Sequence, residues 1–251
     1  MLTSVLVEDT NRVRWIRFNR PEKLNVLRRE DILATRVVME EACNSMDAVV
    51  FCGVGDRSFS AGIHVDDFRG LTPGDARTLI GDLKALLEAA RRAPIPTICA
   101  INGYCLGGAM ELAMACDIRI AVSHAKFGMP EIKVGIPSVL DAALLHQHVG
   151  LSKAKEMLLT GDLYGAEEME RYGFLNKVVE QDKLEDEVVL FLDRVTAHAK
   201  PTLAAQKRLF ETWQNTGLQE SIHASMNEFA LVFGEKETQD AIAAYAGRLK
   251  D

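Results

Sequence analysis

The sequence predicts an α/β fold in which short apolar strands are covered by amphipathic helices. Two observations support this fold class. Short, largely apolar segments recur at residues 48–52, 97–101 and 118–122, and such segments are typical of strands buried on both faces. Between them, residues 29–43 and 74–92 carry apolar side chains at helical spacing, with Pro94 and Pro96 after the second helix.

The two ends of the chain differ from this alternating pattern. Residues 4–7 and 12–18 are expected to form a β-hairpin around the polar turn at 8–11. A short helix is expected at 109–115. After residue 151 the pattern is mostly helical, with helices expected at 152–159, 165–171, 183–197, 202–214, 217–233 and 236–249, and one strand at 174–179. Pro201 marks the change, so we expect a core over residues 1–198 and a helical region over 199–251.

Composition excludes several classes of function. The 251 residues carry a net charge of -7, which leaves no general electrostatic attraction for nucleic acid or an anionic membrane surface. No apolar stretch is long enough to span a membrane, and no targeting segment is recognised at the N-terminus. The five cysteines form no CxxC pair, which favours reduced thiols. We expect a cytoplasmic protein without nucleic-acid or membrane partners.

Two glycine-containing turns follow two of the apolar segments, at residues 60–63 and 106–109. Glycine permits positive φ and close approach of the backbone, and the second turn also begins a helix whose first N–H groups lack partners. An N–H from each turn pointing at one oxygen would make an oxyanion hole. Such turns also serve as plain connections in α/β proteins, and the residues alone leave both interpretations open.

Two glutamates are candidate proton-transfer groups. Glu111 lies one turn into the helix that follows Gly108, within an apolar run, and burial would raise its pKa. Its alternative is an exposed carboxylate favoured by the helix dipole. Glu131 follows Pro130 at the end of a predicted strand, and its alternative is a solvated loop residue.

The ordered motifs of this chain resemble the crotonase (enoyl-CoA hydratase) superfamily over about residues 5–245. The resemblance rests on the run NGYCLGGAMELAMACD at 102–117 and on RPEKLN at 20–25, FSAG at 59–62, AKFGMPE at 125–131 and LTG at 159–161. It implies a crotonase-type β-β-α superhelical spiral core with a helical C-terminal trimerisation region. It also implies homotrimers, often paired into hexamers, and an acyl-CoA substrate, with no cofactor apart from the coenzyme A that belongs to that substrate.

The resemblance assigns roles to particular residues. Glu111 and Glu131 match the two catalytic glutamates of the hydratases, and the backbone N–H groups of Ile63 and Gly108 match the oxyanion hole. The residues that match the substrate and CoA contacts are Lys23, Ala61, Gly62 and Gly107.

One segment departs from the hydratase pattern. The glycine-rich stretch that usually follows the second glutamate is one residue shorter here and reads GIPSVLDAALL at 135–145. Ser138 and Asp141 are either helix caps or acyl-pocket residues. His64, after the first glycine turn, is either a pocket residue or a packing residue.

The leading hypothesis is an enoyl-CoA hydratase that adds water across the 2,3-double bond of an enoyl-CoA thioester. The alternative is another crotonase reaction on an acyl-CoA, namely double-bond isomerisation, C–C hydrolysis or decarboxylation. A non-catalytic binder of CoA esters is disfavoured by the presence of both glutamates. A metal site at His146 and His148 is not expected, because residues two apart on a helix do not face each other.

Overall fold

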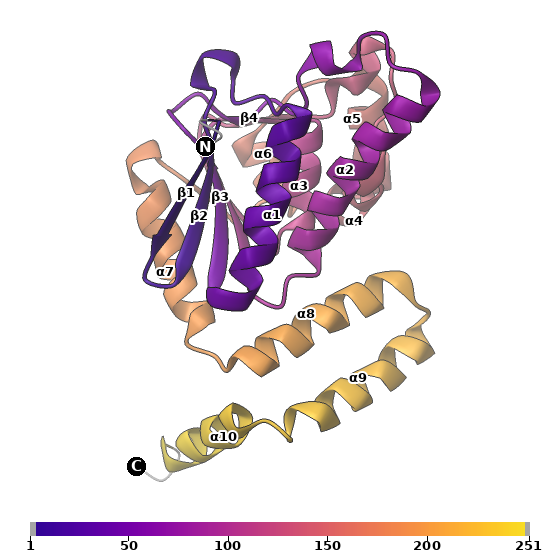
Figure 1. The fold of residues 1–251 in the computed structure, drawn as a ribbon. Coiled ribbons are helices and arrows are strands. Elements are labelled where there is room, and N and C mark those ends of the chain that lie inside the picture. The colour runs from indigo at the N-terminus through magenta and orange to yellow at the C-terminus, as the bar shows by residue number, and fades with distance from the viewer. Residues whose placement is uncertain (1–3, 249–251) are drawn as a thin grey trace.

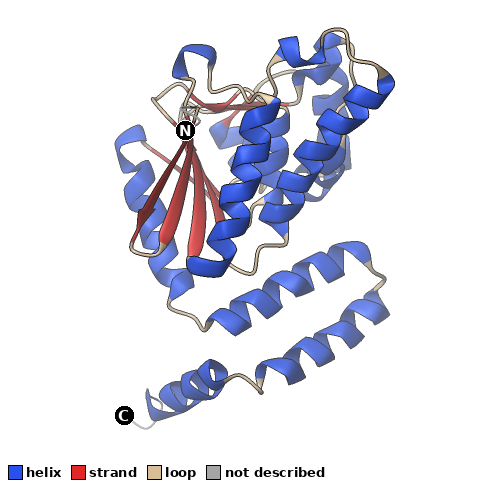
Figure 2. Ribbon diagram, in the orientation of Figure 1, coloured by secondary structure: helices blue, strands red, loops and turns tan. Residues whose placement is uncertain are grey.

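The computed structural model describes residues 4–248 and contains two sheets (Figures 1 and 2). The larger sheet has the order β1-β2-β3-β5-β7-β10, with β1 and β2 antiparallel and the remaining pairs parallel. Its strands are β1 (Val5–Thr10), β2 (Val13–Phe18), β3 (Ala48–Gly53), β5 (Thr97–Ile101), β7 (Ile118–Val122) and β10 (Lys177–Val179). The expectation of buried strands is confirmed, since β3 and β5 are buried throughout.

A second, four-stranded sheet has the order β4-β6-β8-β9. Its strands are β4 (Ser58–Ser60), β6 (Tyr104–Leu106), β8 (Lys126–Gly128) and β9 (Tyr164–Gly165). Each of β3, β5 and β7 is followed by one of these short strands and then by a helix. This repeated strand–strand–helix unit brings the chain segments after β4, β6 and β8 to the same side of the molecule, where the candidate site lies.

Helices cover the larger sheet. Helix α1 (Arg29–Ser45) packs against β1 and β3, and α2 (Pro73–Arg91) runs beside α1 (Figure 1). Helix α3 (Gly108–Ala115) is buried at every position and packs against α2. Helix α7 (Leu184–Thr196) contacts β5 and β7. The core therefore lies between the sheet and these helices, and α3 runs through it.

The remaining helices are short or belong to the C-terminal region. The α-helices are α4 (Leu145–Val149), α5 (Leu151–Thr160), α6 (Ala166–Arg171), α8 (Lys200–Asn215), α9 (Leu218–Val232) and α10 (Lys236–Arg248). The 3-10 helices are η1 (Pro21–Lys23), η2 (Val65–Phe68), η3 (Pro130–Val134), η4 (Leu140–Leu144) and η5 (Gln181–Lys183). Within residues 4–248, no helix is both long and apolar enough to cross a membrane.

Two predicted elements differ from the structure. The hairpin turn is at Asn11 and Arg12, which both have positive φ, so β1 continues through the polar residues 8–10. These residues are exposed on an edge strand, where alternation with buried positions is not required. The strand expected at 174–179 is limited to β10, because Phe174 and Leu175 are buried in the turn before it.

Helix α8 is fastened to the core by an ion pair between buried Lys207 and half-buried Asp117. The Lys207 ammonium lies 2.5 Å from Asp117, and the Lys207 side chain is 7% exposed. Asp117 also accepts hydrogen bonds from the N–H and the hydroxyl of Thr97, at 2.8 and 3.0 Å. This network joins α8 to the start of β5, while α9 and α10 lie further from the sheets (Figure 1).

We predict that Lys207→Met lowers the free energy of unfolding by roughly 3 kcal/mol, because it leaves the Asp117 carboxylate without its cation. Chemical denaturation monitored by circular dichroism measures the change. Lys207→Met combined with Asp117→Asn is expected to recover part of the loss, since no buried charge is then left unpaired. An unchanged denaturation midpoint in the single variant contradicts the prediction.

Candidate active site

A cavity of about 250 Å³ lies between the turns that follow β4 and β6, the start of α3, and η3. The residues expected to form the site gather around it, and those that line it are Ala61, Gly62, Ile63, Gly107, Gly108, Glu111 and Glu131. Among the expected residues, Lys23, His64, Ser138 and Asp141 lie outside this lining.

The amide of Ile63, a residue of the cavity lining, is left free by the pairing of the main chain there. Leu27 forms a parallel bridge to Ile63, in which the Leu27 N–H donates to Gly62 O at 2.8 Å and the His64 N–H donates to Leu27 O at 2.9 Å. Successive N–H groups of an extended chain point to opposite sides. The N–H of Ile63 therefore points away from Leu27.

Gly108 supplies a second free amide. It is the first residue of α3 and follows Gly107, whose φ of 55° and ψ of -128° place it in a region suited to glycine. The first N–H groups of a helix have no partner within it. Within residues 4–248, no protein acceptor takes the N–H of Ile63 or of Gly108. A Cβ placed on Gly62 would lie 3.2 Å from Gly108 N, so the two turns are in close contact.

The carboxyl groups of the two glutamates approach the same glycine turn. Glu111 lies in the first turn of α3 and is 3% exposed, whereas Glu131 lies in η3. A Cβ on Gly107 would lie 2.6 Å from Glu131 Oε1, and a Cβ on Gly108 would lie 3.9 Å from Glu111 Oε2. Both carboxyl groups and the free Gly108 amide therefore belong to one small volume.

The surroundings give the two glutamates different acidities. Burial raises the pKa of Glu111 to about 8, helped by the negative charges of Glu131 and Asp141. Burial also raises the pKa of Glu131, but its own backbone N–H and the Ser138 hydroxyl, which donates to Glu131 Oε2 at 2.9 Å, oppose the rise. At neutral pH Glu111 therefore keeps a proton, while Ser138 stabilises the ionised form of Glu131.

Ser138 and Asp141 do not cap a helix. No side chain caps η4, and the residue before it is Val139. Ser138 instead contacts Glu131, and the Asp141 carboxylate lies 2.5 Å from the guanidinium of Arg91, at the end of α2. No pattern in the sequence indicates the role of Arg91, because its partner Asp141 is 50 residues away along the chain.

The rest of the cavity wall is largely apolar. The side chains come from η2, α2 and the segment 134–139, and they are Val65, Phe68, Ile80, Leu83, Val134, Ile136, Pro137 and Val139. Apart from the two glutamates, the only charged residue in the lining described within residues 4–248 is Lys133. The cavity is therefore suited to an uncharged carbon chain beside the two carboxyl groups.

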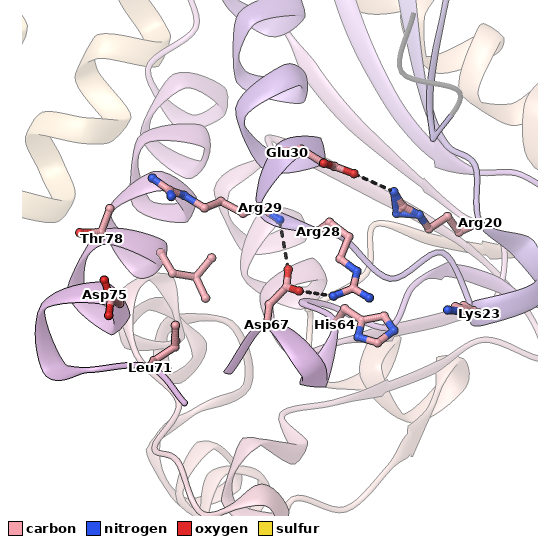
Figure 3. A pocket seen from close by; sticks show the side chains of 11 residues that line it. Arg20, Lys23, Arg28, Arg29, Glu30, His64, Asp67, Leu71, Asp75 and Thr78 are labelled. Atoms are coloured by element: carbon pink, nitrogen blue, oxygen red, sulfur yellow. Dashed lines mark hydrogen bonds and ion pairs between the residues drawn. The ribbon is translucent and has the colours of Figure 1, made fainter. Parts of the chain in front are cut away.

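A second, larger recess of about 730 Å³ lies next to His64 and contains Lys23 (Figure 3). It is lined by basic side chains that alternate with acidic ones, and the basic residues are Arg20, Lys23, Arg28 and Arg29. Arg28 and Arg20 form ion pairs with Asp67 and Asp31. Within the described part of the chain Lys23 has no ion-pair partner, which leaves its charge available to an anionic ligand.

His64 is held at the edge of this recess. Its Nδ1 accepts a hydrogen bond from the Asp66 N–H at 3.2 Å, which caps η2. The imidazole therefore lines the recess that contains Lys23, whereas the neighbouring Ile63 lines the apolar cavity.

Comparison with known proteins identifies the family. The family profile described as enoyl-CoA hydratase/isomerase matches residues 8–251, and this chain therefore belongs to that family. The chain is 30% identical to a crotonyl-CoA hydratase of Syntrophomonas wolfei and 32% identical to a probable enoyl-CoA hydratase of Rhizobium meliloti; each match covers 98% of this chain and 96% of the relative.

A solved structure supports the same fold. The crystal structure of enoyl-CoA hydratase from Thermoplasma volcanium superposes with a TM-score of 0.90 at 28% identity, over 96% of this chain and 97% of that one. The expected crotonase-type core is therefore confirmed.

We predict that Gly107→Ala lowers turnover of an enoyl-CoA substrate by about a hundredfold, the scale of a displacement of about 1 Å at a catalytic group. The added methyl group would overlap Glu131 Oε1 and strain a positive φ. Steady-state kinetics together with thermal unfolding measures both effects. Gly81→Ala, at a helical glycine with no atom near the added Cβ, serves as the matched control. Equal kinetics in Gly107→Ala and wild type contradict the prediction.

Proposed function

We propose that this protein is an enoyl-CoA hydratase, which adds water across the 2,3-double bond of an enoyl-CoA thioester or removes it in reverse. The observation that carries the proposal is the pair of glutamates beside the glycine turn of Gly107 and Gly108, one kept protonated and the other stabilised as an anion. Membership of the enoyl-CoA hydratase/isomerase family and the hydratase names of the relatives support it.

The proposed chemistry uses the main chain to stabilise charge. The thioester oxygen accepts hydrogen bonds from the N–H groups of Ile63 and Gly108. Addition of water at the β-carbon transfers negative charge to that oxygen as an enolate, and fixed donors in a site shielded from water stabilise it. These amides need no rearrangement during the reaction, because β4, β6 and α3 hold them.

The two carboxyl groups divide the proton transfer. One carboxylate accepts a proton from water as the water oxygen bonds to the β-carbon. The other carboxyl group is protonated and delivers its proton to the α-carbon. The pair then still carries one proton in total, so no external acid or base is consumed. In this assignment Glu111, whose pKa is raised by burial to about 8, donates the proton, and Glu131, which accepts a hydrogen bond from Ser138, receives one.

The CoA portion is proposed to extend from the thioester toward Lys23. The backbone at Ala61 and Gly62 lines the cavity, and the recess beyond His64 contains Lys23 with its unpaired charge. Phosphate groups of CoA are suited to such a recess. No separate cofactor is required in this scheme, because coenzyme A is part of the substrate.

We also propose a homotrimer, or a hexamer of paired trimers, in the cytoplasm. One side of α9 exposes Leu218, Ile222, Met226 and Phe229, at helical spacing, which supports association through the C-terminal region. The five cysteines are free thiols, which supports a reducing compartment.

The direct test is loss of the conjugated enoyl-thioester absorbance on mixing the protein with trans-2-enoyl-CoA esters of increasing chain length. We expect hydration by wild type, and a decrease of at least about a hundredfold in kcat for Glu111→Gln and for Glu131→Gln, because each removes one partner of the proton transfer. Product analysis by mass spectrometry separates hydration from double-bond isomerisation, since only hydration adds the mass of water. Failure to hydrate any ester would overturn the proposed function.

The pH dependence of kcat/KM is expected to be bell-shaped. Activity requires a proton on Glu111, so it decreases as the pH rises through about 8, the pKa of that group. It also requires an ionised Glu131, so it decreases in acid as the pH falls through the raised pKa of that group. Ser138→Ala removes a stabilising donor from the Glu131 anion and is expected to move the acidic side to higher pH. An acidic side that does not move contradicts this role of Ser138.

A further inference from the structure

The guanidinium of Arg91 joins the active-site region to the C-terminal region. Its Nη1 lies 2.5 Å from the Asp141 carboxylate in η4, and its Nε lies 2.8 Å from the Glu211 carboxylate in α8. The three side chains are partly shielded from solvent, with exposures of 20% for Arg91, 12% for Asp141 and 17% for Glu211. Arg91 thus links three elements, α2, η4 and α8.

Asp141 lies on the element that packs against Glu111. The 3-10 helix η4 contacts α3, and the N–H of Ala142, the residue after Asp141, donates to Val139 O at 2.9 Å and lies near enough to the Glu111 carboxyl group to oppose the rise in its pKa. The Asp141 charge itself disfavours ionisation of Glu111. Asp141 is therefore close enough to Glu111 to influence its protonation through both position and charge.

The other charged groups around Glu111 and Asp141 come from three further elements. Glu131 faces it from η3. From α2, Arg91 and Glu88 act on Asp141, and from α8 Glu211 does so as well. Arg91 is the cation that contacts Asp141, whereas Arg92 lies 3.5 Å from Glu211 and Lys84 lies 2.6 Å from Glu88. Arg91 therefore balances the carboxylate whose charge acts on Glu111.

We infer that Arg91 is a positioning residue for Glu111: it holds Asp141 and Glu211 together, fixes η4 beside the Glu111 carboxyl group, and offsets the negative charge of Asp141. This inference rests on the proposed function for the kinetic part of its test. Arg91 makes no contact with the substrate cavity and acts only through Asp141 and η4.

A purely structural tie does not account for this arrangement. Lys207 and Asp117 already fasten α8 to the core through a separate ion pair. Arg91 instead contacts Asp141 in η4, the element that packs against α3 and Glu111. The planar guanidinium contacts two carboxylates with different nitrogen atoms, a geometry that a lysine ammonium does not reproduce.

The test compares Arg91→Met, Asp141→Asn and the double variant with wild type, by steady-state hydration kinetics over a range of pH. We expect kcat of Arg91→Met to fall by about tenfold at neutral pH with little change in KM, the scale of a coupling that acts through another residue. Removing the Arg91 cation from this cluster of carboxyl groups raises the pKa of Glu111, whereas removing the Asp141 anion lowers it. The decrease of kcat/KM on the basic side of the pH profile is therefore expected at higher pH in Arg91→Met and at lower pH in Asp141→Asn. In the double variant it returns toward the pH found for wild type.

Lys207→Met is the matched control, because it removes an ion pair that also fastens α8 but does not contact η4. It is expected to lower stability and leave the basic side of the pH profile in place. Arg91→Lys, which keeps the charge but not both contacts, is expected to keep the position of the basic side and lose part of kcat. Thermal unfolding of every variant identifies the temperature range in which all are folded.

A measurement without substrate separates this inference from the proposed function. The carboxyl carbon of Glu111 is followed by NMR in protein carrying ¹³C-labelled glutamate, with the signal assigned by its loss in Glu111→Gln. The Glu111 titration is expected to shift in opposite directions in Arg91→Met and Asp141→Asn. If neither variant moves it, or if Lys207→Met moves it equally, the inference is overturned even when wild type hydrates enoyl-CoA. If wild type hydrates no ester but these opposite shifts occur, only the proposed function fails.

Discussion

The site depends on the close approach of the main chain to carboxyl and carbonyl oxygens at two glycine turns. Gly62 lies against the Leu106 carbonyl, where a Cβ would come within 2.8 Å of the oxygen, and Gly107 leaves space for the Glu131 carboxylate. Any side chain at these positions separates the amides from the acids. The absence of a Cβ is what allows donors and proton-transfer groups to occupy one volume.

Helix α3 is fixed at both ends, which makes its first amide and its glutamate rigid. At its start, the Gly107 N–H donates to Gly128 O at 3.0 Å, joining the turn to β8. At its end, the buried guanidinium of Arg119 donates to the carbonyls of Ala113 and Cys116 at 3.0 and 2.7 Å. A cation at the C-terminus of a helix satisfies its unpaired carbonyls and opposes its dipole. The helix therefore carries Glu111 without freedom to relax toward solvent.

Burial has opposite consequences for stability and for chemistry in this molecule. A carboxyl group as buried as Glu111 resists ionisation, which lowers stability progressively as the pH rises from the ordinary glutamate pKa of 4.5 to about 8, because the unfolded chain ionises over this range. The same resistance supplies an acid with a pKa of about 8, a value that an exposed glutamate does not reach. At Glu131 the backbone N–H and the Ser138 hydroxyl oppose the rise in pKa that burial causes, so two identical side chains have different surroundings.

The sequence by itself determined the α/β class, most strands of the larger sheet and most helices, because apolar runs indicate buried strands and helical spacing of apolar residues indicates amphipathic helices. It also indicated the glycine turns and both glutamates, whose residue types are informative at fixed spacing. The short strands β4, β6 and β9 were not predicted, because two or three residues are too few to show a pattern, and only the end of a strand was predicted at β8. The partners of Ser138, Asp141 and Arg91 were decided only by the tertiary structure. Their contacts join residues far apart along the chain, and a pKa depends on the burial and charges that such contacts create.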